Sequence, residues 1–264
     1  MINGINSREM ILEILLEIEE GEHSHVAIRN ALSKYQFLPK QDRAFITRVC
    51  EGTLEYRIQI DYIINSFSKV TVDKMKPAIR EILRSAVYQL KYMDSVPDSA
   101  VCNEAVKLAQ RKGFYNLKPF VNGVLRTIAR EMDQVRFPQK EDDLLKYLSV
   151  KYSMPEVLVT RWLEAYGEET TEKILADFLT EHPLTIRCRT YLNSKEEIVK
   201  SLESQGVHVT PAPYLPYAYS ISEFNHILAL DAFIKGKIVV QDVSSMLVAE
   251  VADPKKGDYV IDVC

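Results

Sequence analysis

The chain has 264 residues, of which 47% are hydrophobic and 27% are charged. This composition is typical of a globular protein of about two domains and excludes the disordered and collagen-like classes. No apolar run reaches the roughly 18 to 20 residues of a membrane-spanning helix, and residues 1–10 lack a basic stretch followed by an apolar one. We therefore expect a cytoplasmic protein with no membrane partner, and nucleic-acid binding stays open.

The four cysteines, at positions 50, 102, 188 and 264, form no close pair, and the five histidines lack the spacing of metal ligands. The sequence therefore predicts neither a disulfide framework nor a metal site. Cys188 lies between Arg187 and Arg189, and neighbouring cations can lower the pKa of a thiol. No base for it can be identified, so we expect a structural role. A complete enzyme that uses Cys188 is the weakest hypothesis.

Charge is unevenly distributed along the chain. Residues 23–130 hold 18 Lys and Arg against 9 Asp and Glu, a net charge of +9. Residues 141–264 hold 12 against 20, a net charge of −8, and residues 13–22 are acidic as well. The basic region can bind a polyanion by releasing its counterions, or its charges can form an ordinary solvated helical face.

Residues 7–131 carry apolar side chains three or four positions apart, which predicts consecutive amphipathic helices. The expected helices are one capped by Ser7, a short one around 26–32, a single long one from Pro39 to Phe67, one from Pro77, one from Asp98 to Gly113 and one from Pro119. Proline suits the first helical turn and glycine the end of a helix. Short connections between such helices predict a compact bundle.

The second half has a different pattern. A polar stretch at 131–143 indicates a linker. Two or three helices are expected beyond it, and two of them can be placed, from Ser153 to Gly167 and from about 169 to 179. Strands are then expected at 184–190, 207–209 and 238–240. Between the first two strands, a capping box at 194–197 predicts a helix that ends at Gly206. The stretch 211–219 is expected to be irregular, and a last helix is expected to begin at Ser244 or Ser245. The prediction is a mainly α protein: a helical bundle, a helical linker and a small α/β unit.

The apolar run at 259–263 is typical of a buried parallel strand. Parallel neighbours need a crossover of about a dozen or more residues, yet this run is the last part of the chain. We therefore expect a fragment of a longer protein, which stops where the ligand site of an open α/β sheet begins. The alternative is an antiparallel strand that completes a small sheet.

Three groups of segments resemble one known family. They are 41–47 with 51–54; 82–90, 96–100, 103–109 and 120–126; and 241–245, 253–254, 257 and 260–264. Together they resemble the bacterial Sun (Fmu) family, the 16S ribosomal RNA cytosine-C5 methyltransferases called methyltransferase B. The resemblance covers nearly the whole chain, and its middle group also marks a NusB-like RNA-binding helical domain.

The resemblance implies four parts. They are a NusB-like helical domain over 1–132, a helical connector over 133–180, a ferredoxin-like α/β subdomain over 181–240, and the truncated start of a Rossmann-like methyltransferase domain over 241–264. In this family Asp262 and Cys264 would begin the S-adenosylmethionine motif, and both catalytic cysteines lie further on. We therefore expect this chain alone to have no catalytic residue, no bound cofactor and no activity.

For the complete protein, the resemblance implies that a thiolate attacks C6 of a flipped-out cytosine and that C5 takes the methyl group from S-adenosylmethionine. A second cysteine then assists release of the enzyme. These steps also require 16S ribosomal RNA to be held in position, and the resemblance implies that the present chain has this role.

Basic and aromatic side chains of the helical domain are the candidate RNA contacts. They are Arg43, Arg48, Arg57, Arg80, Arg84, Arg111, Lys112, Lys118, Arg126, Arg130, Phe114 and Tyr115. Aromatic rings can stack on bases, and cations can bind phosphates. The other reading is compensation of the helix dipole by Arg111 and Lys112, and ordinary ion pairs for the rest.

A protein-interaction or dimerisation module is the alternative function. The acidic first helix, with its stripe of Ile and Leu, is then the expected contact surface for a weak protein partner or a second copy.

Overall fold

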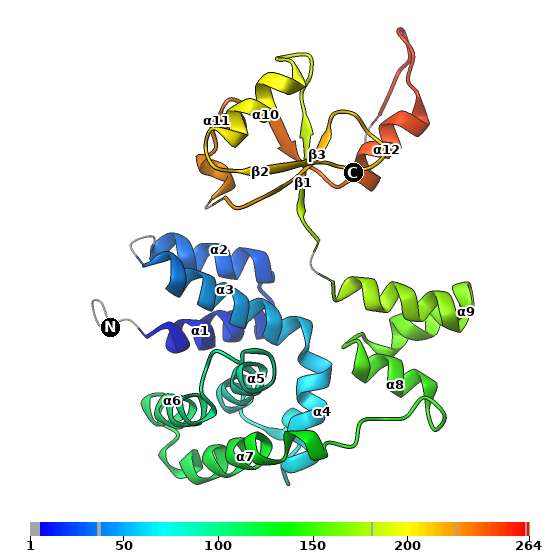
Figure 1. Ribbon diagram of the computed structural model, residues 1–264. Coiled ribbons are helices and arrows are strands. Elements are labelled where there is room, and N and C mark those ends of the chain that lie inside the picture. The colour runs from blue at the N-terminus through cyan, green and yellow to red at the C-terminus, as the bar shows by residue number, and fades with distance from the viewer. Residues whose placement is uncertain (1–5, 36–37, 181, 225, 262, 264) are drawn as a thin grey trace. The chain divides into compact units, whose positions relative to one another are not determined.

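The computed structural model describes residues 6–35, 38–180, 182–224, 226–261 and 263. The chain forms two compact units that divide between Leu179 and Thr180, and each is described by itself (Figure 1). In its described residues the first unit contains helices and no strand, whereas the second combines a small sheet with helices.

The first unit is a run of helices. They are α1 (Ser7–Glu19), α2 (Ser24–Lys34), α3 (Lys40–Glu55), α4 (Arg57–Phe67), α5 (Pro77–Tyr92), α6 (Asp98–Arg111), α7 (Lys118–Glu131), α8 (Leu144–Lys151) and α9 (Glu156–Phe178). Pro77 and Pro119 lie in the first turns of α5 and α7, as the sequence predicts, because proline has no N–H for the helix to satisfy. Gly113 follows α6 at φ +85°, a conformation that glycine adopts without steric cost.

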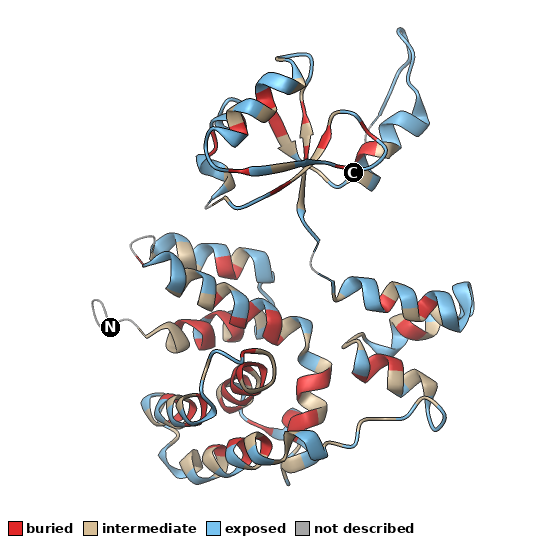
Figure 2. Ribbon diagram, in the orientation of Figure 1, coloured by how far each residue is buried: buried red, intermediate tan, exposed pale blue. Residues whose placement is uncertain are grey.

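The core of this unit surrounds α5, which packs against α1, α3, α4, α6 and α7 (Figure 1). Ile82 and Leu83 of α5 belong to the same core as the fully buried Leu12, Ile63 and Leu125. Figure 2 shows the buried positions on the sides of the helices that face one another. Each such side chain stabilises the fold by roughly 1.5–3 kcal/mol relative to its exposed state.

The expected single helix from Pro39 to Phe67 is wrong, because the chain breaks into α3 and α4 at Tyr56. Tyr56 has φ −94° and ψ 17° and stacks its ring on that of Tyr92, with 4.2 Å between the centroids. The apolar spacing continues across the break because α3 and α4 both bury a face against α5. Periodicity alone therefore does not locate this break.

The helix α8 is not among the helices that the sequence places, and it docks on α4. The Gln59 Nε2 group donates hydrogen bonds to the carbonyl oxygens of Val150 and Lys151, each at 3.1 Å. The next helix, α9, is interrupted at Gly167, which has φ 75° and ψ 174°. This break agrees with the helix end expected at Gly167.

The second unit has a sheet of four strands among its described residues. Its elements are β1 (Leu184–Cys188), α10 (Lys195–Glu203), β2 (His208–Pro211), β3 (Ala218–Ser222), α11 (Asp231–Ile234), β4 (Ile238–Val240) and α12 (Val243–Ala252). The strand order is β2-β3-β1-β4 and all neighbours are antiparallel. This β-α-β-β-α-β connection is the ferredoxin-like, or split βαβ, arrangement. Ile186 and Ile221 of the sheet share a core with Ile198 and Leu202 of α10.

Of two expectations for the second unit, one holds in part and the other is wrong. The stretch 211–219 is irregular from 212 to 217, as expected, but Pro211 ends β2 and Ala218 begins β3, in which Tyr219 pairs with Ile186 of β1. The run 259–263 forms no strand in its described residues, and Tyr259, Ile261 and Val263 are exposed. A buried strand requires neighbours, and none of the described strands lies beside this run.

Two expected helix caps are displaced. Asn6, rather than Ser7, caps α1, since its side chain accepts from two N–H groups of the first turn. Asp242, rather than Ser244 or Ser245, caps α12 and accepts from the Ser244 N–H at 2.8 Å. All of these short polar residues favour the capping position, so the sequence does not rank neighbours.

Candidate nucleic-acid interface

The loop between α6 and α7 brings predicted RNA-binding residues together. Arg111 ends α6, Gly113 reverses the chain, a 3-10 turn spans Tyr115–Leu117, and Lys118 begins α7. Because α6 and α7 pack against each other, helices hold both ends of the loop. Two cations thus flank an aromatic residue on one short, anchored segment.

Three side chains of this loop have no direct partner. Tyr115 exposes 60% of its surface. Within the described part of the chain, no carboxylate lies within ion-pair distance of Arg111 or Lys118. Arg111 lies near enough to Glu104 to help lower the pKa of that carboxyl, but Glu104 pairs directly with Lys107. A cation without an ion pair is available to a phosphate, and an exposed ring can stack on a base.

Lys112 and Phe114 have structural contacts instead. The Lys112 ammonium lies 3.0 Å from a carboxylate oxygen of Glu13 and 3.4 Å from one of Glu9, and these contacts raise the pKa of Lys112. The Phe114 ring packs against the core, with the Lys76 Nζ 5.5 Å from its centroid. Lys112 therefore ties the end of α6 to α1, and Phe114 anchors the loop.

Arg126 and Arg130 lie one turn apart on α7, as expected. They differ in whether a carboxylate of the protein pairs with the guanidinium group. The Arg126 Nε group donates to Asn122 Oδ1 at 2.8 Å, and this neutral partner leaves the charge of Arg126 uncompensated. Arg130 pairs with Glu131 at 2.6 Å, and its side chain is exposed. Such a surface pair contributes about 0–1 kcal/mol, so RNA phosphate competes with it easily.

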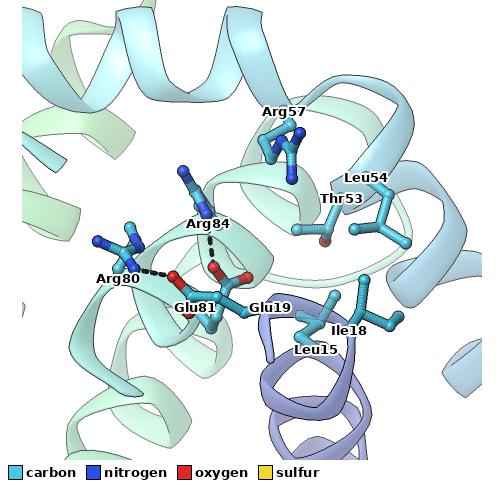
Figure 3. Close-up of a pocket in the computed structure, with 9 residues that line it drawn as sticks. All are labelled: Leu15, Ile18, Glu19, Thr53, Leu54, Arg57, Arg80, Glu81 and Arg84. Carbon is cyan, nitrogen blue, oxygen red and sulfur yellow. Dashed lines mark hydrogen bonds and ion pairs between the residues drawn. The ribbon is translucent and has the colours of Figure 1, made fainter. Parts of the chain in front are cut away.

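Arg80 and Arg84 join three helices of the bundle, and Figure 3 shows the pairs of Arg80 with Glu19 and of Arg84 with Glu81. Arg84 donates to both carboxylate oxygens of Asp61, at 2.7 and 2.6 Å, and to Glu81 at 2.6 Å. Arg80 pairs with Glu19 and donates to the Val72 carbonyl oxygen at 3.1 Å. Both guanidinium groups are compensated by carboxylates, so we interpret them as connectors of α1, α4 and α5.

Arg57 lines a cavity of about 240 Å³, and Arg80 and Arg84 line this cavity as well (Figure 3). Arg57 is exposed and forms no ion pair with the described residues, and the two carboxylates of the cavity, Glu19 and Glu81, pair with Arg80 and Arg84 instead. The Thr53 hydroxyl and the Arg80 Nε group are buried without a hydrogen-bond partner among the described atoms. Arg57 therefore stays a candidate contact, apart from the α6–α7 loop.

The remaining candidates are dispersed. Arg43 donates from Nη1 to the Leu38 carbonyl oxygen at 3.3 Å, and Arg48 is exposed on the same helix, α3. The two expected cofactor residues, Asp262 and Cys264, lie outside the described residues.

The described cysteines are buried thiols. Burial raises the pKa of Cys188 to about 11, so the lowered pKa considered from its two arginine neighbours is wrong. Successive side chains of a strand point to opposite faces, which puts Arg187 and Arg189 on the other face from Cys188. Burial also raises the pKa of Cys50 and of Cys102. None of these thiols has the lowered pKa of a nucleophile.

The acidic first helix does not present an apolar face. Ile11, Leu12 and Leu15 of α1 are fully buried in the bundle core, so the expected docking stripe is wrong. Three of its acidic residues, Glu9, Glu13 and Glu19, pair with cations of α5 or of the segment after α6.

The described residues contain no group of three or more His, Cys, Asp and Glu side chains placed to hold a metal ion. No helix in the same residues combines the length and apolarity needed to cross a membrane.

Comparisons with known proteins agree with this architecture. Residues 5–130 match the NusB family, and residues 154–227 match the family described as "Methyltr_RsmF/B-like, ferredoxin-like domain". The chain combines a NusB domain with an RsmF/B-type ferredoxin-like domain. The resemblance to the methyltransferase B family is confirmed by these two matches and by the curated relatives.

Two relatives carry the name of this family. The chain is 32% identical to the "Probable ribosomal RNA small subunit methyltransferase B" of Bacillus subtilis, over 97% of this chain and 57% of the relative. It is 30% identical to the protein of the same name from Synechocystis, over 98% of this chain and 58% of the relative. The chain thus spans somewhat more than half the length of these relatives.

A solved structure shares the fold. The structure named "Crystal Structure of PH0851" matches with a TM-score of 0.70 and 24% identity, over 96% of this chain and 57% of that one. At this identity the match supports the fold alone.

Proposed function

We propose that this chain is the RNA-binding part of an S-adenosylmethionine-dependent 16S ribosomal RNA cytosine-C5 methyltransferase of the cytoplasm. In this proposal it holds the RNA in position for a catalytic domain outside residues 1–264, and it is inactive alone. The names of the relatives and the match to the NusB family support the proposal.

The uncompensated cations of the α6–α7 loop are the observation that carries this proposal. Arg111 and Lys118 lack carboxylate partners in the described residues, and Tyr115 lies between them. Arg126 adds a third such charge on α7. Phosphate contacts by these residues release counterions, which makes binding steeply dependent on salt.

The cofactor of the complete protein is also a proposal. Residues 258–261 form no strand and are exposed, so they do not enclose a cofactor by themselves. We propose that Asp262 and Cys264 begin a cofactor motif that continues outside this chain, and that the domain boundaries follow the four parts expected from the sequence.

The test is fluorescence anisotropy of a labelled 16S ribosomal RNA hairpin with residues 1–264 at two salt concentrations. We expect micromolar or weaker affinity that falls steeply with salt. Arg111→Gln together with Lys118→Gln should weaken binding and reduce the salt slope by about one for each lost phosphate contact.

The matched control is Lys173→Gln together with Lys235→Gln, which removes two cations that are already paired with carboxylates and are not candidate RNA contacts. Binding should change less in the control than in the loop variant. Absence of RNA binding at low salt, or equal loss in both variants, contradicts the proposal.

A further inference from the structure

A second cavity lies where the connector meets the helical bundle. Its volume is about 260 Å³, and its lining includes Lys91 of α5, Phe137 of the connector, and Tyr147 and Lys151 of α8. Most of this lining comes from residues 131–153, which lie between the two segments that match known families. Ligand pockets for drug-sized molecules run from roughly 300 to 1,000 Å³, so this smaller cavity suits a single base.

The walls of this cavity are fixed by contacts between the connector and α4. The Tyr62 hydroxyl donates to the Arg136 carbonyl oxygen at 2.7 Å, and the Tyr62 ring stacks on that of Phe137 with 5.7 Å between centroids. Gln59 holds the end of α8 through its two hydrogen bonds to backbone carbonyl groups. The aromatic wall is therefore in place before any ligand arrives, which lowers the entropic cost of binding.

The ammonium group of Lys91 forms no direct ion pair or hydrogen bond with the described residues. Its Nζ lies 5.3 Å from the centroid of Phe137 and 5.5 Å from that of Tyr92. Burial lowers the pKa of Lys91, and the negative charge of Asp133 nearby opposes this shift only in part. The partly buried ammonium is therefore a donor without a direct acceptor.

The ammonium group of Lys151, which also lines this cavity, already has partners within the protein. Its Nζ donates to the Tyr147 hydroxyl at 2.6 Å and pairs with Glu172 at 3.0 Å. Lys151 therefore shapes the cavity, and Lys91 is the group left to bind a ligand.

We infer that this cavity binds one unpaired, keto-bearing base of an RNA strand, and that it takes uracil in preference to adenine. The aromatic side chains supply a stacking surface, as in other single-strand binding sites. The Lys91 ammonium donates to a keto oxygen of the base. The inference rests on the proposed RNA-binding function and adds a base-specific contact to it.

The chemistry of the bases explains the preference. Uracil presents the O4 acceptor at the edge where adenine presents an amino donor, and an ammonium group only donates. A hydrogen bond to a charged group is worth enough to change affinity by about tenfold. Adenine forfeits this contact and also brings its amino group against a cation.

The experiment compares labelled oligo(U) and oligo(A) of equal length on residues 1–264 by anisotropy, with duplex RNA as a third probe. Wild type should prefer oligo(U). Lys91→Met keeps the apolar stem over the rings and should lower affinity for oligo(U) by about tenfold, with little effect on duplex RNA. Lys91→Arg should restore part of the preference.

Lys76→Met is the matched control, because it also removes an ammonium placed over an aromatic ring, that of Phe114, outside this cavity. It should leave the ratio of oligo(U) to oligo(A) affinity unchanged. Circular dichroism of each variant checks the fold, and a misfolded Lys91→Met leaves Lys91→Gln as the second variant.

A base in this cavity can belong to an RNA strand or to a free nucleotide. Titration with uridine 5′-monophosphate, followed by saturation-transfer NMR, distinguishes these two ligands. A base preference of the oligonucleotides that depends on Lys91 supports the inference. Binding of the free nucleotide without any oligonucleotide preference overturns it in favour of a small-molecule site. If wild type binds duplex RNA but shows no preference for oligo(U) that depends on Lys91, this inference alone is overturned. If wild type binds none of the RNA probes, the proposed function is overturned as well.

Discussion

Gly52 lies where α3 passes the ring of Tyr88. A Cβ atom at Gly52 would overlap this ring, and both residues are buried. Tyr88 in turn stacks with Tyr56 and contacts Tyr92, so the ring cannot move without disturbing the α3–α4 break. The absence of a side chain at this one position therefore allows three tyrosines to pack at the centre of the bundle.

Gly52→Ala should lower the free energy of unfolding by about 1–3 kcal/mol, as overpacking of a core does. The control is Gly123→Ala, because Gly123 lies inside α7 and an added Cβ meets nothing within 4 Å. This control should be neutral or stabilising by up to about 1 kcal/mol. Urea denaturation measures both, and equal stabilities would contradict the predicted overlap.

At the scale of elements, side-chain networks join helices that are distant in sequence. Arg84 of α5 holds Asp61 of α4 and Glu81 of its own helix, and Glu81 exposes only 4% of its side chain. Burial raises the pKa of Glu81 even though Arg84 opposes this shift. The ionised carboxylate therefore depends on the guanidinium group beside it.

Arg84→Met should lower the free energy of unfolding by about 3 kcal/mol, because it leaves two carboxylates without their shared partner. Lys173→Met is the comparison, since it breaks an exposed pair with Glu169 that is worth about 1 kcal/mol or less. Thermal unfolding of the two variants should differ by several degrees. A Tm of Arg84→Met at the wild-type value would show that the network contributes no stability.

Glu172 of α9 likewise joins distant segments, because it pairs with Lys151 of α8 and with Lys140 of the connector. Hydrogen bonds from Lys151 and Lys140 lower the pKa of Glu172 to about 2, from 4.5. A lowered folded-state pKa stabilises the fold above the unfolded value and loses this effect as the pH falls through the folded one. The contribution of Glu172 is thus complete at neutral pH and disappears between about pH 4.5 and 2.

Wild type should therefore exceed Glu172→Gln in Tm at pH 7, and this difference should shrink as the pH falls below about 4.5. Glu169→Gln removes an exposed carboxylate of the same helix and is the control. A constant difference across this pH range would contradict the assignment of the stabilisation to the ionised carboxylate.

At the scale of the whole molecule, the two units have separate hydrophobic cores. The core around α5 and the core that contains Ile186 and Leu202 share no residue. A domain with its own core can open locally without the rest of the chain. The RNA-binding loop that we propose lies in the first unit, and the ferredoxin-like sheet lies in the second.

Ile186→Ala should destabilise the second unit by about 2–5 kcal/mol. Hydrogen exchange measured by mass spectrometry should show faster exchange in β1, β3 and α10 and unchanged protection in α1 and α3–α7. RNA affinity should also be retained if the loop of the first unit carries it. Loss of protection across both units would mean that they unfold together.

Much of the fold could be predicted from local signals. Prolines in the first turns of α5 and α7, Gly113 after α6 and Gly167 within α9 all lie where the sequence places helix boundaries. The break at Tyr56 could not be predicted, because it depends on the stacking of tyrosines from different helices. The run 259–263 shows the converse, since an apolar pattern without neighbouring strands forms no strand in its described residues.

The sequence by itself determined many helix boundaries, the basic character of residues 23–130 and the resemblance to methyltransferase B, because these depend on residues close together in the chain. Only the tertiary structure decided which cations are available. Lys112 is compensated by Glu13, which is 99 positions away, and Arg84 by Asp61, which is 23 positions away, whereas Arg111 and Lys118 have no such partner among the described residues. The physical reason is that an ion pair requires contact within a few ångströms, and that contact is created by the packing of helices.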